Sequence, residues 1–283
     1  MRGEKMNVDE TVVRHLNYLC KTYDGATKLI VSTKNRIAAL NPDAIADHQE
    51  EVKALESFKG KLTRKIEKEL EFWPVWTEWL KDLPGVGPFI GGNLVLLYYY
   101  RFTPVCPCGT ALVKKQVEKD GKEFNTFWCE SCKKSMKGDG VTQHKVQEKD
   151  FPNISGWWHY CGRHVIEGKM PKRKKGEVVD WSSRGRMIGF QFGDQINRQS
   201  ETHLYKKFML ERKAKREKTH PEASKGHRHN MAKHETVKLF LAHFWTVART
   251  LDGKTVSAPY AETILGHTGI IEPYYFDLKA LAA

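Results

Sequence analysis

The sequence predicts a mainly α-helical protein that carries a small β-structured insertion. Three observations lead to this fold class. Apolar residues recur at helical spacing over residues 12–40 and again over residues 43–70. Residues 83–94 read LPGVGPFIGGNL, which places glycines between two apolar segments. Four cysteines then follow in two close pairs, Cys106 with Cys108 and Cys129 with Cys132.

The two periodic stretches predict a long antiparallel α-hairpin. The dipeptide Asn41-Pro42 separates them, and proline starts a helix more readily than it continues one. The second stretch has apolar residues at spacings of three or four, namely Val52, Leu55, Phe58, Leu62, Ile66 and Leu70. Such stripes pack against each other. The hairpin can serve as internal packing or as the arm of a homodimer, and the sequence leaves both open.

The segment at residues 83–102 predicts a helix-hairpin-helix. Gly85 permits the positive φ of a sharp turn, and Pro88 suits the first turn of the second helix. We expect Gly87 to admit another backbone and Gly91 to let the two helices touch. The free N–H groups at the second helix form an anion site, so Gly85, Val86 and Gly87 are candidates to contact a DNA phosphate. The alternative is an ordinary corner of a helical core.

The cysteine pairs predict a zinc ribbon at residues 103–136. Twenty residues separate Cys108 from Cys129, and they suit two strands around a turn at Asp120-Gly121. Four thiolates complete the tetrahedron of a structural Zn²⁺ and leave no open position, so we expect no zinc catalysis. A module of this size depends on its metal. The first pair is one residue shorter than usual, and four reduced thiols are the alternative.

Positive charge is concentrated in one part of the chain. The net charge is +13, and residues 169–218 hold 15 Lys and Arg against 6 Asp and Glu. Such a surplus predicts a face that binds a polyanion, the alternative being a solvated surface. The residues expected to contact DNA here are Lys172, Arg173, Lys174, Lys175, Arg184, Arg186, Lys206, Lys207, Arg212 and Lys213.

Two polar stretches are predicted as loops. Residues 133–150 suggest a linker, and the histidine-rich residues 220–234 suggest a basic loop that contacts phosphate. For the histidines, a metal site and a histidine–asparagine–histidine nuclease are the alternatives. Residues 237–251 predict a final helix.

The pattern as a whole divides the chain into five segments. We expect an α-hairpin at 9–82, a helix-hairpin-helix at 83–102, the ribbon at 103–136, a basic helical region at 150–252 and an extension at 253–283. The sequence has no apolar run of membrane-spanning length and no signal peptide at its start. We therefore expect a cytoplasmic, nucleoid-associated protein with no membrane partner.

The order of these features resembles the C-terminal part of the bridge-RNA-guided insertion-sequence transposases, which join a RuvC-like nuclease domain to a helix-hairpin-helix transposase domain. The matching motifs are LPGVG after a long hairpin, Phe151-Pro152, Tyr160-Cys161-Gly162, Ser183-Arg184-Gly185-Arg186 and a late helix at 238–245. The resemblance implies DNA transposition or recombination. It also implies RNA or a separate nuclease subunit as a further partner.

Two departures from that family affect the expected activity. The RuvC-like carboxylates have no counterpart in this sequence, and Lys172 to Lys175 stand where the family has a Ser-Gly pair. We therefore expect a DNA-binding, transposase-like protein without its own nuclease centre, and the sequence leaves its status as an enzyme open. One alternative is an active recombinase with Ser182 or Ser183 as nucleophile. Another is a zinc-ribbon repair or transcription factor.

Overall fold

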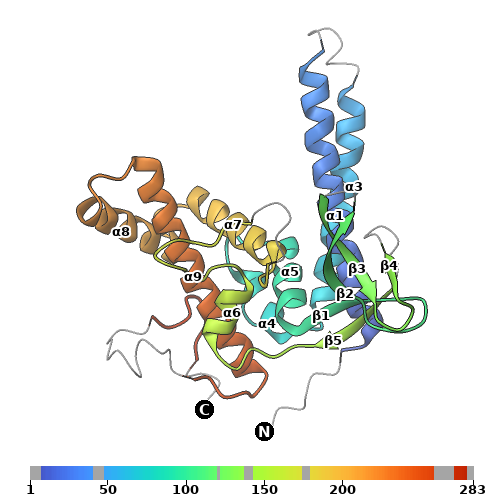
Figure 1. Cartoon of the computed structure of the whole chain (residues 1–283). Helices are drawn as coiled ribbons and strands as arrows, with labels where there is room; N and C mark the ends of the chain where they lie inside the picture. Colours follow the sequence, from blue (N-terminus) through green and yellow to red (C-terminus); the bar gives the residue numbers. More distant parts are fainter. Residues whose placement is uncertain are drawn as a thin grey trace. The chain divides into compact units, whose positions relative to one another are not determined.

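The structure is a computed structural model that describes residues 8–40, 48–119, 122–136, 143–173, 179–257 and 271–278 (Figure 1). It is mainly helical, with one two-stranded and one three-stranded antiparallel sheet in the described part, as the sequence predicted at this level. The chain divides into two compact units. Unit 1 comprises Met1–Leu96 and Ile188–Ala283, and unit 2 comprises Leu97–Met187.

Both boundaries between the units fall inside helices, namely α5 and α7. The helices are α1 (Glu10–Ala38), α3 (Gln49–Leu70), α4 (Pro74–Thr77), the 3₁₀ helix η1 (Leu80–Asp82), α5 (Pro88–Tyr99), α6 (Ile154–Tyr160), α7 (Ser183–Arg198), α8 (Leu204–Thr219) and α9 (Lys225–Leu251). The strands are β1 (Tyr100–Val105), β2 (Val113–Lys119), β3 (Lys122–Cys129), β4 (Lys134–Met136) and β5 (Gln143–Glu148). Within the described ranges, no helix is long and apolar enough to cross a membrane.

Helices α1 and α3 lie side by side in unit 1 (Figure 1). They run antiparallel, because His15 near the start of α1 pairs with Glu69 near the end of α3 at 2.8 Å, and Lys34 pairs with Glu56 at 2.7 Å. The buried apolar residues of the pair lie toward the end at which α1 begins and α3 ends, and they include Ile66 of α3. Farther along, Phe58 stays exposed.

The turn at Gly85 has the geometry that the sequence predicted for it. Gly85 has φ +88°, and the Val86 N–H donates to the Leu83 carbonyl at 3.0 Å. Proline followed by a glycine at positive φ is the signature of a type II turn. Helix α5 begins at Pro88, also as predicted.

Helix α3 ends at Leu70, where the second helix of the hairpin was predicted to end, and the short α4 and η1 follow it before the turn. One expectation about this region is wrong. Gly87 admits no close backbone, because a Cβ atom built there meets nothing within 4 Å. The close approach is at Gly91, where a Cβ atom would lie 2.5 Å from Cζ3 of Trp76 in α4. Trp76 is fully buried, so Gly91 is the residue that lets α5 pack on α4.

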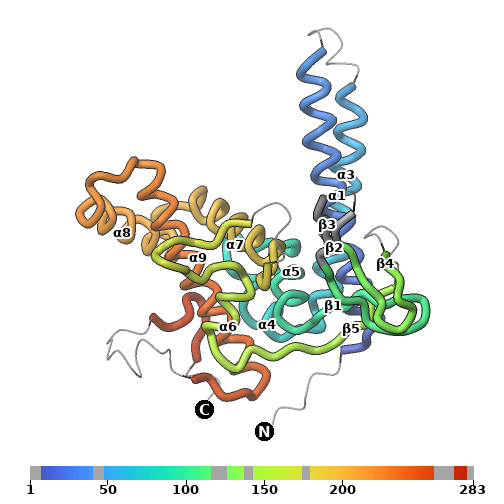
Figure 2. The backbone as a smooth tube through the Cα atoms, in the orientation of Figure 1, coloured from blue at the N-terminus to red at the C-terminus, as the bar shows by residue number. Residues whose placement is uncertain are grey.

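Helices α7, α8 and α9 follow one another in chain order in the backbone trace (Figure 2). Their side chains meet in an aromatic cluster, in which Phe192 of α7 stacks on Phe240 of α9 with centroids 3.7 Å apart. Tyr205 of α8 approaches both rings edge-on. This cluster holds the three helices together inside unit 1.

Residues 271–277 pack onto the same cluster. His243 of α9 is buried and donates from Nε2 to the Ile271 carbonyl at 3.0 Å, while the Tyr205 hydroxyl donates to its Nδ1 at 2.7 Å. Burial lowers the pKa of His243 to about 4, which keeps the ring neutral and suits this pattern. Trp79 Nε1 donates to the Tyr274 carbonyl at 2.8 Å.

Two stretches predicted as loops contain regular structure. Residues 133–150 include β4 and β5, and β5 pairs with β1 in a register that sets Val146 opposite Phe102. The histidine-rich stretch is helical from Lys225, so α9 begins twelve residues before the predicted position 237. Ser224 caps it, because its side chain accepts from the His227 N–H.

The packing at Gly91 predicts that Gly91→Ala destabilises unit 1 by about 1–3 kcal/mol, since the added methyl group collides with a buried indole. Gly87→Ala is the matched control in the same segment. It should change the free energy of unfolding by less than about 0.5 kcal/mol, because the position is open. Urea unfolding of both variants measures this difference. Equal losses in the two variants would contradict the assigned packing.

Candidate metal centre and basic surfaces

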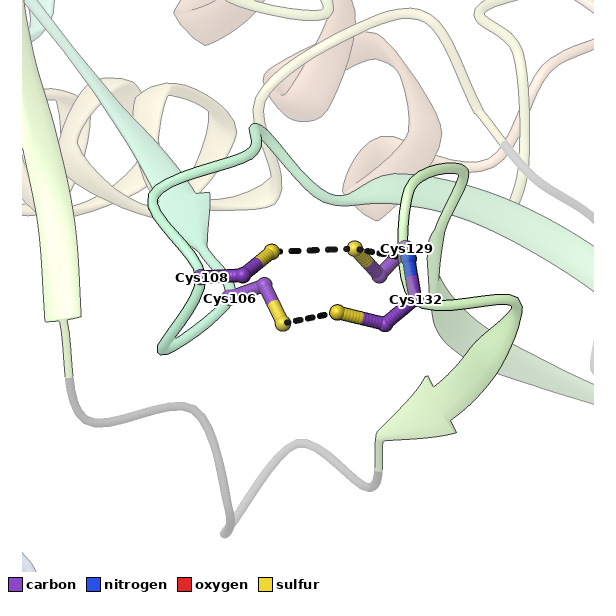
Figure 3. A group of neighbouring side chains, drawn as sticks. All are labelled: Cys106, Cys108, Cys129 and Cys132. Carbon is purple, nitrogen blue, oxygen red and sulfur yellow. Dashed lines mark hydrogen bonds between the residues drawn. The ribbon is translucent and has the colours of Figure 1, made fainter.

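The four cysteines of the two pairs converge on one point in unit 2 (Figure 3). Their sulfur atoms all lie within 4.8 Å of one another. Cys106 Sγ is 3.8 Å from Cys132 Sγ, and Cys108 Sγ is 3.6 Å from Cys129 Sγ. A tetrahedral ion with Zn–S bonds of about 2.3 Å requires sulfur separations of about 3.8 Å. The cluster can therefore hold a metal ion, whereas a disulfide requires about 2.05 Å.

The backbone forms a similar turn at each cysteine pair. The residue after the second cysteine has positive φ in both, Gly109 at +85° and Lys133 at +51°. In the first turn the Cys106 N–H donates to the Thr110 carbonyl at 2.8 Å. In the second, the Cys132 N–H donates to Cys129 Sγ at 3.4 Å. The short Cys-x-Cys spacing thus still brings both sulfur atoms to the cluster.

The thiols strongly influence one another. The hydrogen bond between Cys108 Sγ and the Thr110 hydroxyl is the largest cause that lowers the pKa of Cys108 to about 6. The neighbouring thiols, Cys108 first, raise the pKa of Cys132 to about 12. Four thiolates at this separation repel one another, so a bound cation is what allows all four to ionise together.

Among the described side chains, the apolar core beside the cluster is small. It consists of Cys106, Leu112 and Cys129, with Phe127, Cys132 and Met136 packed against it. A core of this size supplies little stability by itself, and an ion held by the four sulfur atoms would add to the stability of the sheet β2–β3–β4.

The glycine turn lines a cavity of about 660 Å³ in unit 1. Gly85, Val86 and Gly87 all contribute to its wall. The charged residues of the lining are Lys59, Lys81, Asp24, Asp82 and Asp194. Three carboxylates against two ammonium groups give this cavity no positive excess, so its charge adds nothing to phosphate binding at the turn.

The basic strip before α7 is only partly described. Lys174 and Lys175 lie outside the described residues, and Lys172 and Arg173 are exposed. Arg186 makes internal contacts: its guanidinium donates to the Pro171 carbonyl and lies 4.9 Å from the centre of the Trp181 ring. Arg184 is partly buried. Arg173 is therefore the described residue of this strip with an exposed guanidinium.

The candidates on α8 differ in their surroundings. Arg212 lies 3.6 Å from Glu235 of α9, which Arg216 also binds, so Arg212 is partly neutralised. Lys207 is exposed. Lys206 and Lys213 lie near His229 and Lys233 of α9, because Lys233, Lys213 and Lys206 all lower the pKa of His229, although burial is the larger cause. Together, Lys206, Lys213, His229 and Lys233 are called the α8–α9 basic face below.

His229 and Lys233 were not among the residues that the sequence predicted to contact DNA. Residues 220–234 were predicted as a loop, and in a loop the spacing between His229 and Lys233 carries no meaning. Lys225, His229 and Lys233 recur every fourth residue, and that spacing places them on one side of a helix. Within the described residues, the groups able to hold a metal include no histidine.

Ser182 and Ser183 line a second cavity, of about 410 Å³, in unit 2. Ser182 caps α7, since its Oγ accepts from the Gly185 N–H at 3.1 Å. Ser183 is exposed, and its Oγ accepts from Arg173 Nη1 at 3.3 Å. A structural role thus accounts for Ser182 but not for Ser183.

The cluster geometry predicts that the purified chain binds about one equivalent of Zn²⁺. Cys129→Ser should lose the metal, because it removes a buried ligand, whereas Ser131→Ala in the same turn should retain it. Elemental analysis of the two variants measures the difference. Less than about half an equivalent in the unmodified chain would overturn the metal site.

Comparisons with protein-family models, with curated proteins and with solved structures found no match for this chain.

Proposed function

We propose that this chain is a DNA-binding, transposase-like protein that contacts the phosphate backbone through the α8–α9 basic face. One observation carries the proposal: α8 and α9 pack against each other, and they bring Lys206 and Lys213 of α8 to the side of α9 that holds His229 and Lys233. The charges of all three lysines act on His229. Fixed cations of this kind attract a polyanion.

Glu235 of α9 does little to neutralise the face. Glu235 is already bound by Arg216 at 2.5 Å and lies 3.6 Å from Arg212. Lys206 donates to the Asn197 carbonyl at 2.5 Å, which orients the ammonium group without cancelling its charge. The repulsion that remains is relieved when a phosphate backbone binds and releases its counterions.

The finer features belong to the same proposal. The cysteine cluster holds a structural Zn²⁺ in a zinc ribbon, and the turn at Gly85 acts as a helix-hairpin-helix that presents N–H groups to phosphate. Transposition or recombination as the biological role rests on the resemblance of the sequence motifs. RNA or a separate nuclease subunit is the further partner in this proposal, and a nuclease subunit would supply DNA cleavage.

A second copy of the chain is the proposed partner of the α1–α3 hairpin. Large apolar side chains remain exposed on it, namely Leu29, Val31, Leu40 and Phe58. Their burial between two hairpins would remove this apolar surface from water.

The basic face predicts a steep salt dependence. If about six phosphates are contacted, log K should fall with log[salt] at a slope near −5. Replacing Lys206, Lys213 and Lys233 by glutamine should reduce that slope by roughly 3, since each lysine neutralises one phosphate. Fluorescence anisotropy with a labelled DNA duplex provides the measurement.

The matched control removes the same charge elsewhere in unit 1. Glutamine at Lys28, Lys61 and Lys65 of the α-hairpin should leave the slope nearly unchanged. An equal loss in both triple variants would show that net charge alone is responsible. A flat salt titration of the unmodified chain would overturn the proposal.

A serine-dependent recombinase is the second candidate function, and one observation favours it. Ser183 is exposed in a cavity beside Arg173, and this pairing sets a nucleophile next to a cation able to hold the scissile phosphate. Tyr160 lines the same cavity, and its hydroxyl bonds Ser182.

For this candidate, Ser183→Ala should abolish strand transfer and the covalent protein–DNA intermediate. Ser182→Ala should retain both and lose about 1 kcal/mol of stability, because it removes a helix cap. Gel assays on supercoiled plasmid and thermal unfolding separate the two effects. Strand transfer that survives the double variant would exclude a serine nucleophile at either position.

A further inference from the structure

The cavity of about 410 Å³ in unit 2 combines residues from separate parts of the sequence. The three-stranded sheet contributes Lys114, Thr126 and Phe127, and the C-terminal end of α6 contributes Tyr160. The remaining lining residues are Arg173, Val179, Asp180, Trp181, Ser182 and Ser183. The lining of the cavity therefore contains two cationic side chains, three serine or threonine residues and three aromatic rings.

The charge of this lining favours an anion. Arg173 and Lys114 are its cations, and Asp180 is its carboxylate. His159 Nε2 lies 2.8 Å from Asp180 Oδ2, and this hydrogen bond is the main reason that the pKa of Asp180 is lowered. The carboxylate thus already has a partner beside it. Arg173, whose Nη1 donates to Ser183 Oγ at 3.3 Å, can turn its remaining N–H groups to a ligand.

The size of the hollow points beyond phosphate alone. Cavities that hold small organic ligands start at about 300 Å³, and this one is about 410 Å³. Lys114 Nζ lies 5.8 Å from the centre of the Phe127 ring, so a cation and a ring stand side by side in the wall. Cations that meet phosphate beside rings that meet a base are the usual composition of a single-strand site.

We propose that this cavity binds one unstacked nucleotide of a single-stranded nucleic acid, with its phosphate at Arg173 and Ser183. The inference rests on the proposed nucleic-acid binding. It names a single nucleotide as the part of the nucleic acid that unit 2 recognises. A terminal phosphate and an internal phosphodiester share this chemistry, and the experiment below distinguishes them.

The cysteine cluster supports one wall of the site. Phe127 packs against the core formed by Cys106, Leu112 and Cys129, and it also lines the cavity. Loss of the metal would release this wall, so nucleotide binding should weaken when a chelator removes it. The ribbon then has a role in the site beyond its own folding.

The test measures binding of the full chain to four probes by calorimetry: inorganic phosphate, thymidine 5′-monophosphate, and a ten-residue oligothymidylate with and without a 5′-phosphate. We expect the mononucleotide to bind more tightly than inorganic phosphate. Arg173→Gln should weaken the mononucleotide and at least one oligonucleotide by about tenfold or more, since it removes a charged hydrogen-bond donor. If the oligonucleotide with a 5′-phosphate binds more tightly, the cavity holds a terminal phosphate. If both oligonucleotides bind equally, it holds an internal phosphodiester.

Lys115→Gln is the control, because Lys115 neighbours Lys114 on β2 but pairs with Glu130 at 2.6 Å outside the cavity lining. It should bind all four probes as the unmodified chain does. Equal affinity of phosphate and mononucleotide, or unchanged binding by Arg173→Gln, would overturn the inference. Binding of duplex DNA is measured in parallel. If the chain does not bind duplex but still binds the nucleotide, the proposal for the α8–α9 basic face is wrong and the proposal for this cavity stands.

Discussion

The stacking of Phe192 on Phe240 is the contact on which the arrangement of α7, α8 and α9 depends. Both rings are fully buried, and Tyr205 closes the cluster from α8. Aromatic pairs of this kind add to the stability that burial alone supplies. The lysines of the α8–α9 basic face repel one another, so apolar packing beneath them is what keeps them together. A charged surface of this protein is thus maintained by uncharged contacts.

Unit 2 differs from this, since the described side chains of its three-stranded sheet form only a small apolar core beside the four sulfur atoms. Phe127 touches that core and also lines the neighbouring cavity. Two ligands that stabilise the same wall must assist each other by equal amounts, because linkage is reciprocal. If the cysteines hold a metal ion and the cavity holds a nucleotide, each bound ligand would tighten the binding of the other.

The sequence predicted best where a few residues carry a specific local constraint. The Pro84-Gly85 pair predicted a turn with positive φ, and cysteine spacing predicted a cluster of four sulfur atoms. Prediction failed where structure depends on distant partners. Strand β5 is polar and alternates weakly, and its pairing with β1, 38 to 48 residues earlier, is what makes it a strand. The first half of α9 has no apolar period, so only the Ser224 cap marked its start.

The site shows the same division. The four cysteines were found because their spacing alone limits them to few arrangements. The cavity beside Ser183 was not found, since its lining comes from a sheet and a helix end that are distant in sequence. Gly91 was correctly expected to let two helices touch, whereas the close backbone expected at Gly87 is not there, because a glycine's neighbours cannot be read from its own position.

The division of the chain into units has a consequence for its synthesis. Unit 2 is a single continuous stretch, Leu97–Met187, whereas unit 1 needs segments on both sides of it. The ring of His243 binds the Ile271 carbonyl, so the packing of unit 1 is completed only after residues near position 271 have left the ribosome. All residues of unit 2 therefore leave the ribosome before unit 1 can be completed, while α4 still lacks α9, on which it packs. In a cell, this interval is when the growing chain most needs protection by chaperones.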